Sequence, residues 1–182
     1  MSASFRVALP KTISAFLPLI LSGLLQAQIR EPISDFKLLT PSTGWVVAGN
    51  NLLWTDSAGS SWSSITPSAS KGGPIHGVFF INATSGWTLL TEAGTNDTAG
   101  QLQLMRTADA GRSWSPTSFQ LDADDLAAFS GSTHIFFADP MHGWMMLGVA
   151  SSSNFRFGLL FATSDGGGTW AKLPTPPIGE HV

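Results

Sequence analysis

Thr107-Ala108-Asp109-Ala110-Gly111-Arg112-Ser113-Trp114 and Thr163-Ser164-Asp165-Gly166-Gly167-Gly168-Thr169-Trp170 are two copies of one pattern, Thr-x-Asp-x-Gly-x-Ser/Thr-Trp. A third, degenerate copy runs over 55–62, with Asp56 one place early and Ser57 where the Asp should stand. The closing Trp residues stand at positions 62, 114 and 170, so the pattern recurs at a nearly regular interval. A recurrence of this kind indicates a repeat architecture.

The chemistry of this pattern is that of a β-hairpin turn. The Asp carboxylate can accept hydrogen bonds from backbone N–H groups a few residues on. The Gly supplies the positive φ that other residues resist, and the Trp covers the apolar edge of the hairpin. Because each carboxylate serves its own turn, we expect the motif to be structural rather than catalytic or metal-binding. The turn residues predicted in this way are Asp109, Gly111, Trp114, Asp165, Gly167 and Trp170.

A second marker, the dipeptide Gly-Trp, precedes each copy of the turn. It occurs at Gly44-Trp45, Gly86-Trp87 and Gly143-Trp144, each time between two apolar runs. Short apolar runs bounded by turn residues predict β-strands. We therefore expect Trp45, Trp87 and Trp144 to be structural residues at the start of a strand.

The turn motif resembles the Asp-box, or bacterial neuraminidase repeat, of sialidases, sortilin-type receptors and many bacterial β-propellers. The longer unit is similar to the blades of photosystem II stability and assembly factors. The resemblance covers about 35–175. It implies an all-β chain of four-stranded antiparallel propeller blades, with the Asp-boxes on outer turns away from the central face where ligands bind.

On this template the repeats predict blade 1 over 35–67, blade 2 over 75–119 and blade 3 over 133–175. The intervening segments are a leader over 28–34, an inter-blade loop over 120–132 and, over 176–182, a linker to a missing fourth blade. Propellers typically close with four to eight blades. Three blades therefore predict an incomplete array, either a fragment or, alternatively, half of a six-bladed ring made by self-association.

The first residues have the order of a secretory signal peptide. Arg6 and Lys11 give a positive start, 15–25 is apolar, and Gln26-Ala27 precedes a predicted cleavage. The alternative is a retained anchor, but the apolar run is shorter than the roughly 20 residues that a membrane span needs. We therefore expect 1–27 to be removed and the protein to be exported, to the periplasm or outside the cell.

Composition excludes several classes of function. The chain has no Cys, so neither disulfides nor thiolate sites can form. Its net charge is −3 and becomes more negative once Arg6 and Lys11 are removed. A nucleic-acid partner requires a basic face, so we expect none. Nor do we expect a membrane span after cleavage.

Two groups of side chains are candidate metal ligands. Asp122, Asp124 and Asp125 supply oxygen ligands, but they lack the glycine and the distal Glu of a calcium loop. Their alternative role is the acidic start of a short helical turn. The four histidines are scattered, with no ligand-like spacing: His76, His134, His142 and His181. We therefore expect no metal and no cofactor.

Two functions from different classes follow from the resemblance. The first is a non-enzymatic binding or assembly scaffold that binds an unknown protein or glycan partner through its loops. The resemblance implies the scaffold role but no photosystem partner, because assembly factors bind through an arginine-rich surface and the Arg residues of this chain are scattered. The alternative is a fragment of a sialidase-superfamily glycoside hydrolase. Retaining sialidases use a Tyr nucleophile, and this chain has no Tyr. Its three Glu residues are not clustered either (Glu31, Glu92 and Glu180). We therefore expect no catalytic residue.

Overall fold

The computed structural model describes residues 31–94, 100–150 and 156–174, all of which belong to one unit, Glu31–Val182. The predicted signal peptide, the start of the predicted leader and the predicted linker 176–182 lie outside the described residues. No helix in the described part of the chain is long and apolar enough to cross a membrane.

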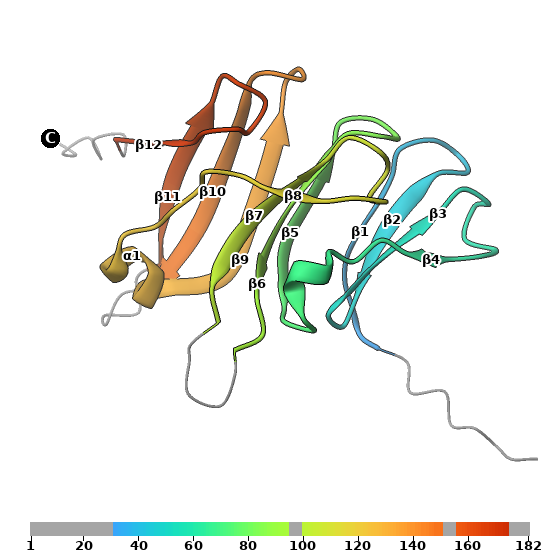
Figure 1. Cartoon of the computed structure of the whole chain (residues 1–182), viewed down its shortest axis with the longest axis horizontal. Coiled ribbons are helices and arrows are strands. Elements are labelled where there is room, and N and C mark those ends of the chain that lie inside the picture. Colours follow the sequence, from blue (N-terminus) through green and yellow to red (C-terminus); the bar gives the residue numbers. More distant parts are fainter. Residues whose placement is uncertain (1–30, 95–99, 151–155, 175–182) are drawn as a thin grey trace, which may run out of the picture. The chain divides into compact units, whose positions relative to one another are not determined.

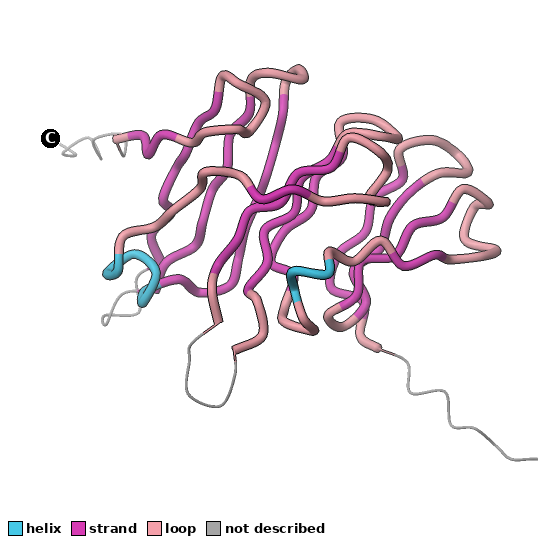
Figure 2. The backbone as a smooth tube through the Cα atoms, viewed as in Figure 1, coloured by secondary structure: helices cyan, strands magenta, loops and turns pink. Residues whose placement is uncertain are grey.

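Each repeat forms one four-stranded antiparallel sheet, and the strands of each sheet follow chain order (Figures 1 and 2). Sheet one comprises β1 (Ile33–Leu38), β2 (Gly44–Ala48), β3 (Asn51–Thr55) and β4 (Ser63–Ser64). Sheet two comprises β5 (Ile75–Phe80), β6 (Gly86–Thr91), β7 (Leu102–Thr107) and β8 (Ser115–Pro116). Sheet three comprises β9 (Phe129–Phe137), β10 (Gly143–Ala150), β11 (Arg156–Thr163) and β12 (Ala171–Leu173). The predicted all-β fold class is confirmed.

Two apolar clusters fill the spaces between consecutive sheets. One joins sheets one and two through residues such as Trp45, Val47 and Phe80. The other joins sheets two and three through residues such as Trp87 and Phe137. Strand β6 lies between the two clusters, so its residues from Gly86 to Leu90 are buried on both faces. Burial of this apolar surface is the main source of stability in such a stack.

The glycine of each Gly-Trp pair makes room for a neighbouring side chain. Phe80 lies opposite Gly86, and Phe137 lies opposite Gly143. A Cβ atom at Gly86 would stand 2.6 Å from the Phe80 ring, and one at Gly143 would stand 2.7 Å from the Phe137 ring. Both aromatic rings therefore pack onto bare backbone, and a larger residue in place of either glycine would displace the ring.

The segment 120–132, predicted as an inter-blade loop, contains a helix and the start of a strand. Helix α1 (Ala123–Ala128) begins after Asp122, whose side chain accepts a hydrogen bond from the Asp125 backbone N–H. Strand β9 begins at Phe129, because Phe129 pairs with Val149 at the far end of the long strand β10. The only other helix in the described part of the chain is the 3₁₀ turn η1 (Ser68–Ser70).

The fourth strand of each sheet is short, at two or three residues. Strand β4 pairs with β3 at only two positions, and β8 pairs with β7 at only two positions. The outer edges of β3 and β7 are therefore only partly covered.

Candidate functional site

The Asp109 side chain organises the turn between β7 and β8. Its Oδ1 accepts from the Ser113 backbone N–H at 2.8 Å, and its Oδ2 accepts from the Ser113 hydroxyl at 2.6 Å. The Thr107 hydroxyl donates to Oδ1 at 2.8 Å and accepts from the Gly111 N–H at 2.9 Å. Both carboxylate oxygens and the preceding threonine are therefore used inside the turn.

The turn between β11 and β12 repeats this arrangement around Asp165. Thr169 donates its backbone N–H to Oδ1 at 2.9 Å and its hydroxyl to Oδ2 at 2.7 Å. The Thr163 hydroxyl donates to Oδ1 at 2.7 Å and accepts from the Gly167 N–H at 3.0 Å. Two turns separated by a whole repeat thus share the same set of hydrogen bonds.

These hydrogen bonds favour the ionised carboxylates. Hydrogen bonds from the Ser113 side chain and backbone, followed by the one from Thr107, lower the pKa of Asp109 to about 2. Bonds from the Thr169 backbone and side chain hold the pKa of Asp165 far below its usual range. A general acid needs a pKa near the working pH. Neither carboxyl is therefore suited to donate a proton near neutral pH.

In sheet one, Ser57 stands at the position of the Asp, as its place in the degenerate copy suggested. The Ser57 hydroxyl accepts from the Ser61 N–H at 3.0 Å and lies 2.8 Å from the Ser61 hydroxyl. The Thr55 hydroxyl accepts from the Gly59 N–H at 3.0 Å, as its counterparts do in the other turns. The shape of this turn is thus kept without a carboxylate.

Two Trp residues of the markers, Trp87 and Trp114, connect one sheet to the next. Trp87 stacks on Phe137 with ring centroids 3.6 Å apart, and its Nε1 donates to the Gly166 carbonyl at 3.1 Å. Trp114 Nε1 donates to the Ile65 carbonyl of sheet one at 2.8 Å. Trp170 packs edge-on against Phe137. Trp45 is buried, whereas Trp144 is exposed.

The acidic cluster after β8 is engaged in structural contacts. Asp122 caps helix α1, and its pKa is lowered chiefly by the hydrogen bond from the Asp125 backbone. Lys172 of β12 forms ion pairs with Asp125 and Asp122. Within the described residues, no group of three or more His, Asp or Glu side chains is placed to hold a metal ion.

Two histidines that are far apart in the sequence meet at one pocket, which the sequence analysis did not anticipate. The pocket has a volume of about 410 Å³ and lies where β1, β5 and β9 converge, between Asp35, His76 and His134. His76 Nδ1 lies 3.2 Å from the Gly131 carbonyl, and its Nε2 lies 2.7 Å from the Thr91 hydroxyl. Burial lowers the pKa of His76. The neutral imidazole therefore donates from Nδ1 and accepts at Nε2, which makes His76 a structural element of the pocket wall.

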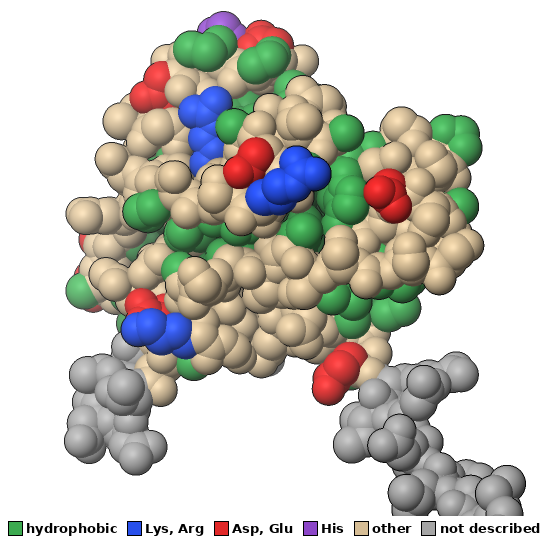
Figure 3. All heavy atoms as spheres, turned by 45° about the vertical axis from the view of Figure 1, so that its right-hand side comes forward, with side chains coloured by type: hydrophobic (Ala, Val, Ile, Leu, Met, Phe, Trp, Pro, Cys, Tyr) green, Lys and Arg blue, Asp and Glu red, His purple; other side chains and the backbone are tan. Residues whose placement is uncertain are grey.

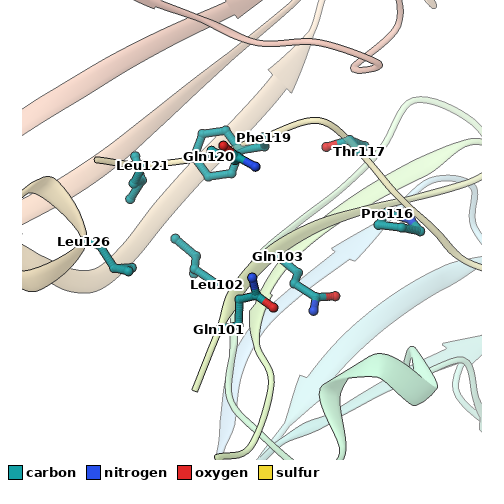
Figure 4. Close-up of a pocket in the computed structure, with 9 residues that line it drawn as sticks. All are labelled: Gln101, Leu102, Gln103, Pro116, Thr117, Phe119, Gln120, Leu121 and Leu126. Carbon is teal, nitrogen blue, oxygen red and sulfur yellow. The ribbon is translucent and has the colours of Figure 1, made fainter. Parts of the chain in front are cut away.

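A second hollow of about 410 Å³, the amide groove, lies between the outer part of sheet two and helix α1 (Figure 4). Its lining combines the amide side chains of Gln101, Gln103 and Gln120 with apolar groups, among them Leu102, Phe119, Leu121 and Leu126. None of its lining residues carries a charge. The groove therefore offers hydrogen-bond donors and acceptors beside apolar surface, which is suited to binding a neutral polar ligand.

Sequence reasoning missed the amide groove because its residues come from separate segments. Gln101 and Gln103 belong to the region of β7, whereas Gln120 follows β8 and Leu126 lies on α1. The chain crosses from sheet two toward sheet three between these segments, where the Ser118 N–H donates to the Gly168 carbonyl at 3.1 Å. The sequence signal that could have indicated the groove is the presence of three glutamines at β7 and just after β8.

No protein-family model matches this chain. No curated protein matches it either. Among solved structures, a YCF48 bound to a D1 peptide aligns with a TM-score of 0.55 and 22% identity, over 79% of this chain and 40% of that one. A YCF48 from Cyanidioschyzon merolae aligns with a TM-score of 0.48 and 18% identity, over 79% of this chain and 37% of that one.

A GH74 xyloglucanase from Xanthomonas campestris aligns with a TM-score of 0.48 and 20% identity, over 75% of this chain and 22% of that one. The chain thus spans less than half the length of each of these structures. The resemblance to assembly-factor propellers is confirmed at the level of the fold. Sheets one to three are three consecutive blades of a β-propeller.

Proposed function

We propose that this protein is an exported, non-enzymatic propeller that binds an extended segment of a partner protein in the amide groove and serves as an assembly scaffold. The observation that carries the proposal is the uncharged, amide-lined groove beside strand β7. Support at the level of the fold comes from the YCF48 structure, which is described as bound to a D1 peptide. Export rests on the order of residues in the leader 1–27.

The chemistry of the groove matches that of a peptide. A peptide backbone presents alternating N–H donors and C=O acceptors, and each glutamine amide offers both kinds of group. Gln103 is held in place, since its amide donates to Glu92 Oε2 at 3.2 Å. Leu121 and Leu126 supply apolar contact surface between the amides. A segment of neutral polar and apolar residues suits this lining better than a charged one.

Part of the outer edge of β7 is left unpaired by the short strand β8. Strand β8 pairs with β7 only at Met105 and Arg106. Among the described residues, Leu102 and Gln103 pair with β6 alone, and both of them line the groove. An exposed strand edge can accept an added strand from a partner, whose main chain then extends the sheet. The groove therefore lies where a peptide strand would lie.

A display library of random linear peptides and a glycan array test this proposal in parallel. We expect enrichment of uncharged linear peptides, and we expect Gln120→Ala and Leu126→Glu to weaken the binding of the enriched peptides at least tenfold. Met141→Glu is the matched control, because Met141 is also an exposed apolar residue but lies outside the groove. Its binding should equal that of the wild type.

Three results would overturn parts of the proposal. Glycan binding that is lost in Gln120→Ala, without peptide enrichment, would make the groove a sugar site. Hydrolysis of chromogenic glycosides by the purified protein would make it an enzyme. An intact mass that retains residues 1–27 in secreted material would rule out cleavage of the leader.

A further inference from the structure

The first strands of the three sheets carry Asp35, Gly77 and His134 at equivalent positions. Each of these residues stands three places before the residue that lies opposite the glycine of its Gly-Trp pair. Gly77, on the middle strand, has no side chain, and a Cβ atom built there would stand 3.0 Å from both Cβ and Cγ2 of Thr133. The pocket of about 410 Å³ between Asp35, His76 and His134 is therefore space that a larger residue at position 77 would enter.

Irregular strand pairing shapes the same end of these strands. The register shifts at Ser34 in β1 and at His76 in β5, so each strand carries one extra residue there relative to its partner. A bulge of this kind re-aims a side chain and recurs beside functional sites. Both extra residues line the pocket. Two neighbouring sheets thus depart from regular pairing at the place where the pocket opens.

The Asp35 side chain lies on the side of β1 that faces sheet two. Lys37, two residues along the same strand, places its Nζ 4.7 Å from the centre of the Phe79 ring of sheet two. Residues two apart on a strand share a face, so Asp35 also faces sheet two, toward the pocket that it lines. Its Oδ1 accepts from the Phe36 N–H at 2.8 Å. Among the described residues, Asp35 forms no ion pair.

The Thr133 hydroxyl is a buried polar group of the pocket that lacks a partner. Thr133 is 9% exposed, and its Oγ1 has no hydrogen-bond partner among the described residues. By contrast, both ring nitrogens of His76 are engaged, one with the Gly131 carbonyl and the other with the Thr91 hydroxyl. An unsatisfied buried hydroxyl lowers stability. A ligand that donates a hydrogen bond to Oγ1 would offset that loss.

The lining favours a hydrogen-bond donor that carries a positive charge. Asp35 is the only Asp or Glu of the pocket, and no Lys or Arg lines it. The hydroxyls of Ser34, Ser132 and Thr133 add acceptor oxygens. The chain as a whole is poor in charge, and charged side chains are few and scattered on the face that Figure 3 shows. One carboxylate therefore sets the electrostatic preference of the pocket.

We propose that this pocket binds a primary ammonium group, with Asp35 as the charged partner and the Thr133 hydroxyl as the buried acceptor. A primary ammonium has three N–H donors and no acceptor, and its bond to a carboxylate is stronger than a bond between neutral groups. Two sources share this chemistry, the lysine side chain of a partner protein and a free alkyl diamine. The pocket shares no lining residue with the amide groove. The two sites can therefore be tested independently.

A titration of the purified protein followed by backbone amide NMR tests the proposal. The probes are Nα-acetyl-lysine methylamide, which presents a lysine side chain, and the free diamine cadaverine. We expect the signals of Gly77, Thr133 and their neighbours to shift with at least one of the two, and the probe that binds more tightly identifies the source. Pentanol keeps an alkyl chain without the charge and should cause no shift. Absence of these shifts with both amines, or equal shifts with pentanol, would overturn the proposal.

Three variants assign the roles of the residues. Asp35→Asn keeps an acceptor for the Phe36 N–H but removes the charge, so it should weaken amine binding about tenfold or more. Asp56→Asn is the matched control, because Asp56 is also an exposed carboxylate of sheet one but lies outside the pocket. Its affinity should equal that of the wild type. Unchanged affinity in Asp35→Asn, or an equal loss in Asp56→Asn, would also overturn the proposal.

Thr133→Val separates binding from stability. Valine nearly keeps the shape of the side chain and removes the unsatisfied hydroxyl, so the melting temperature should rise while amine binding weakens. A purely structural role of Thr133 would leave the affinity unchanged. Unweakened binding in Thr133→Val would therefore remove the buried acceptor from the proposal.

Discussion

Strands β6 and β10 begin with the same Gly-Trp pair, yet they lie in different surroundings. Trp87 of β6 is fully buried, stacks on Phe137 and donates to Gly166, whereas Trp144 of β10 is exposed. Both tryptophans occupy the same position in their sheets. Sheet three covers Trp87, whereas no sheet follows sheet three in the described part of the chain to cover Trp144. A repeat motif thus specifies a position in a blade, and the neighbouring blade determines what that position contributes to stability.

The largest expected effect separates these two tryptophans. Trp87→Ala removes a fully buried ring from between two sheets and should lower the free energy of unfolding by about 3–5 kcal/mol. Trp144→Ala removes a ring that is 42% exposed and should lower the free energy of unfolding by less than about 1 kcal/mol. Urea unfolding monitored by circular dichroism measures both values. Equal losses in the two variants would show that the surroundings of the two rings do not differ.

Substitutions of two turn glycines, Gly167 beside Trp87 and Gly59 in sheet one, test the same difference in surroundings. Gly167→Ala combines a φ of +84° with a Cβ atom 2.5 Å from Trp87 Nε1, so we expect a loss of about 2–4 kcal/mol. Gly59→Ala has nearly the same φ, +82°, but its Cβ atom would meet only a Trp62 ring atom at 3.5 Å, an ordinary van der Waals distance. This variant should therefore lower the free energy of unfolding only through the strain of a positive φ, by about 1–2 kcal/mol. Thermal unfolding distinguishes the two variants, and a larger loss for Gly59→Ala would contradict the assignment of Trp87 to the Gly167 turn.

Replacing the turn carboxylates should lower stability by a smaller amount, and by more than replacing Ser57 at the same position of sheet one. Asp109→Ala and Asp165→Ala each remove the acceptor of several hydrogen bonds, and we expect the melting temperature to fall by a few degrees in each variant. Ser57→Ala removes only a hydroxyl from the same position and should lower it less. Binding of the enriched peptides should be unchanged in all three. Lost binding with an unchanged melting curve would identify the carboxylates as ligands.

The smallest expected effect is a pH dependence confined to two of the three turns. The pKa of Asp109 is lowered from 3.8 to about 2 in the folded protein, and that of Asp165 is lowered in the same direction. Their contribution to stability is therefore present above about pH 4 and is lost as the pH falls toward about 2. Melting curves measured from pH 5 to pH 2 should fall less steeply for Asp109→Asn than for the wild type. An unchanged slope would contradict the lowered pKa of Asp109, and Ser57→Ala, which removes no titratable group, is the control.

The fold could be predicted because its signals are local. The Thr, Asp and Gly of each turn bond to one another within five residues, so the motif alone carries the hydrogen-bond pattern. The Gly-Trp pair likewise marks the start of a strand that pairs with its sequence neighbours. Even the degenerate turn follows the template, with Ser57 in place of Asp.

The sites could not be predicted, because they depend on contacts between repeats. His76 and His134 meet only where β5 lies beside β9. Gln103 and Gln120 share a groove only because the connection after β8 passes next to β7 on its way to sheet three. The early start of β9 also depends on tertiary structure, since Phe129 finds its partner at the far end of β10.

The two-residue strands β4 and β8 determine how the sheets open. Detaching β4 or β8 breaks only two strand pairings, whereas separating β6 from its neighbours would expose two apolar clusters at once. Local opening therefore begins at the outer rim and stops at the strand before it. In amide hydrogen exchange, the rim should lose its protons quickly and β6 slowly. The rim of sheet two, where the amide groove lies, can thus rearrange around a ligand without unfolding the stack.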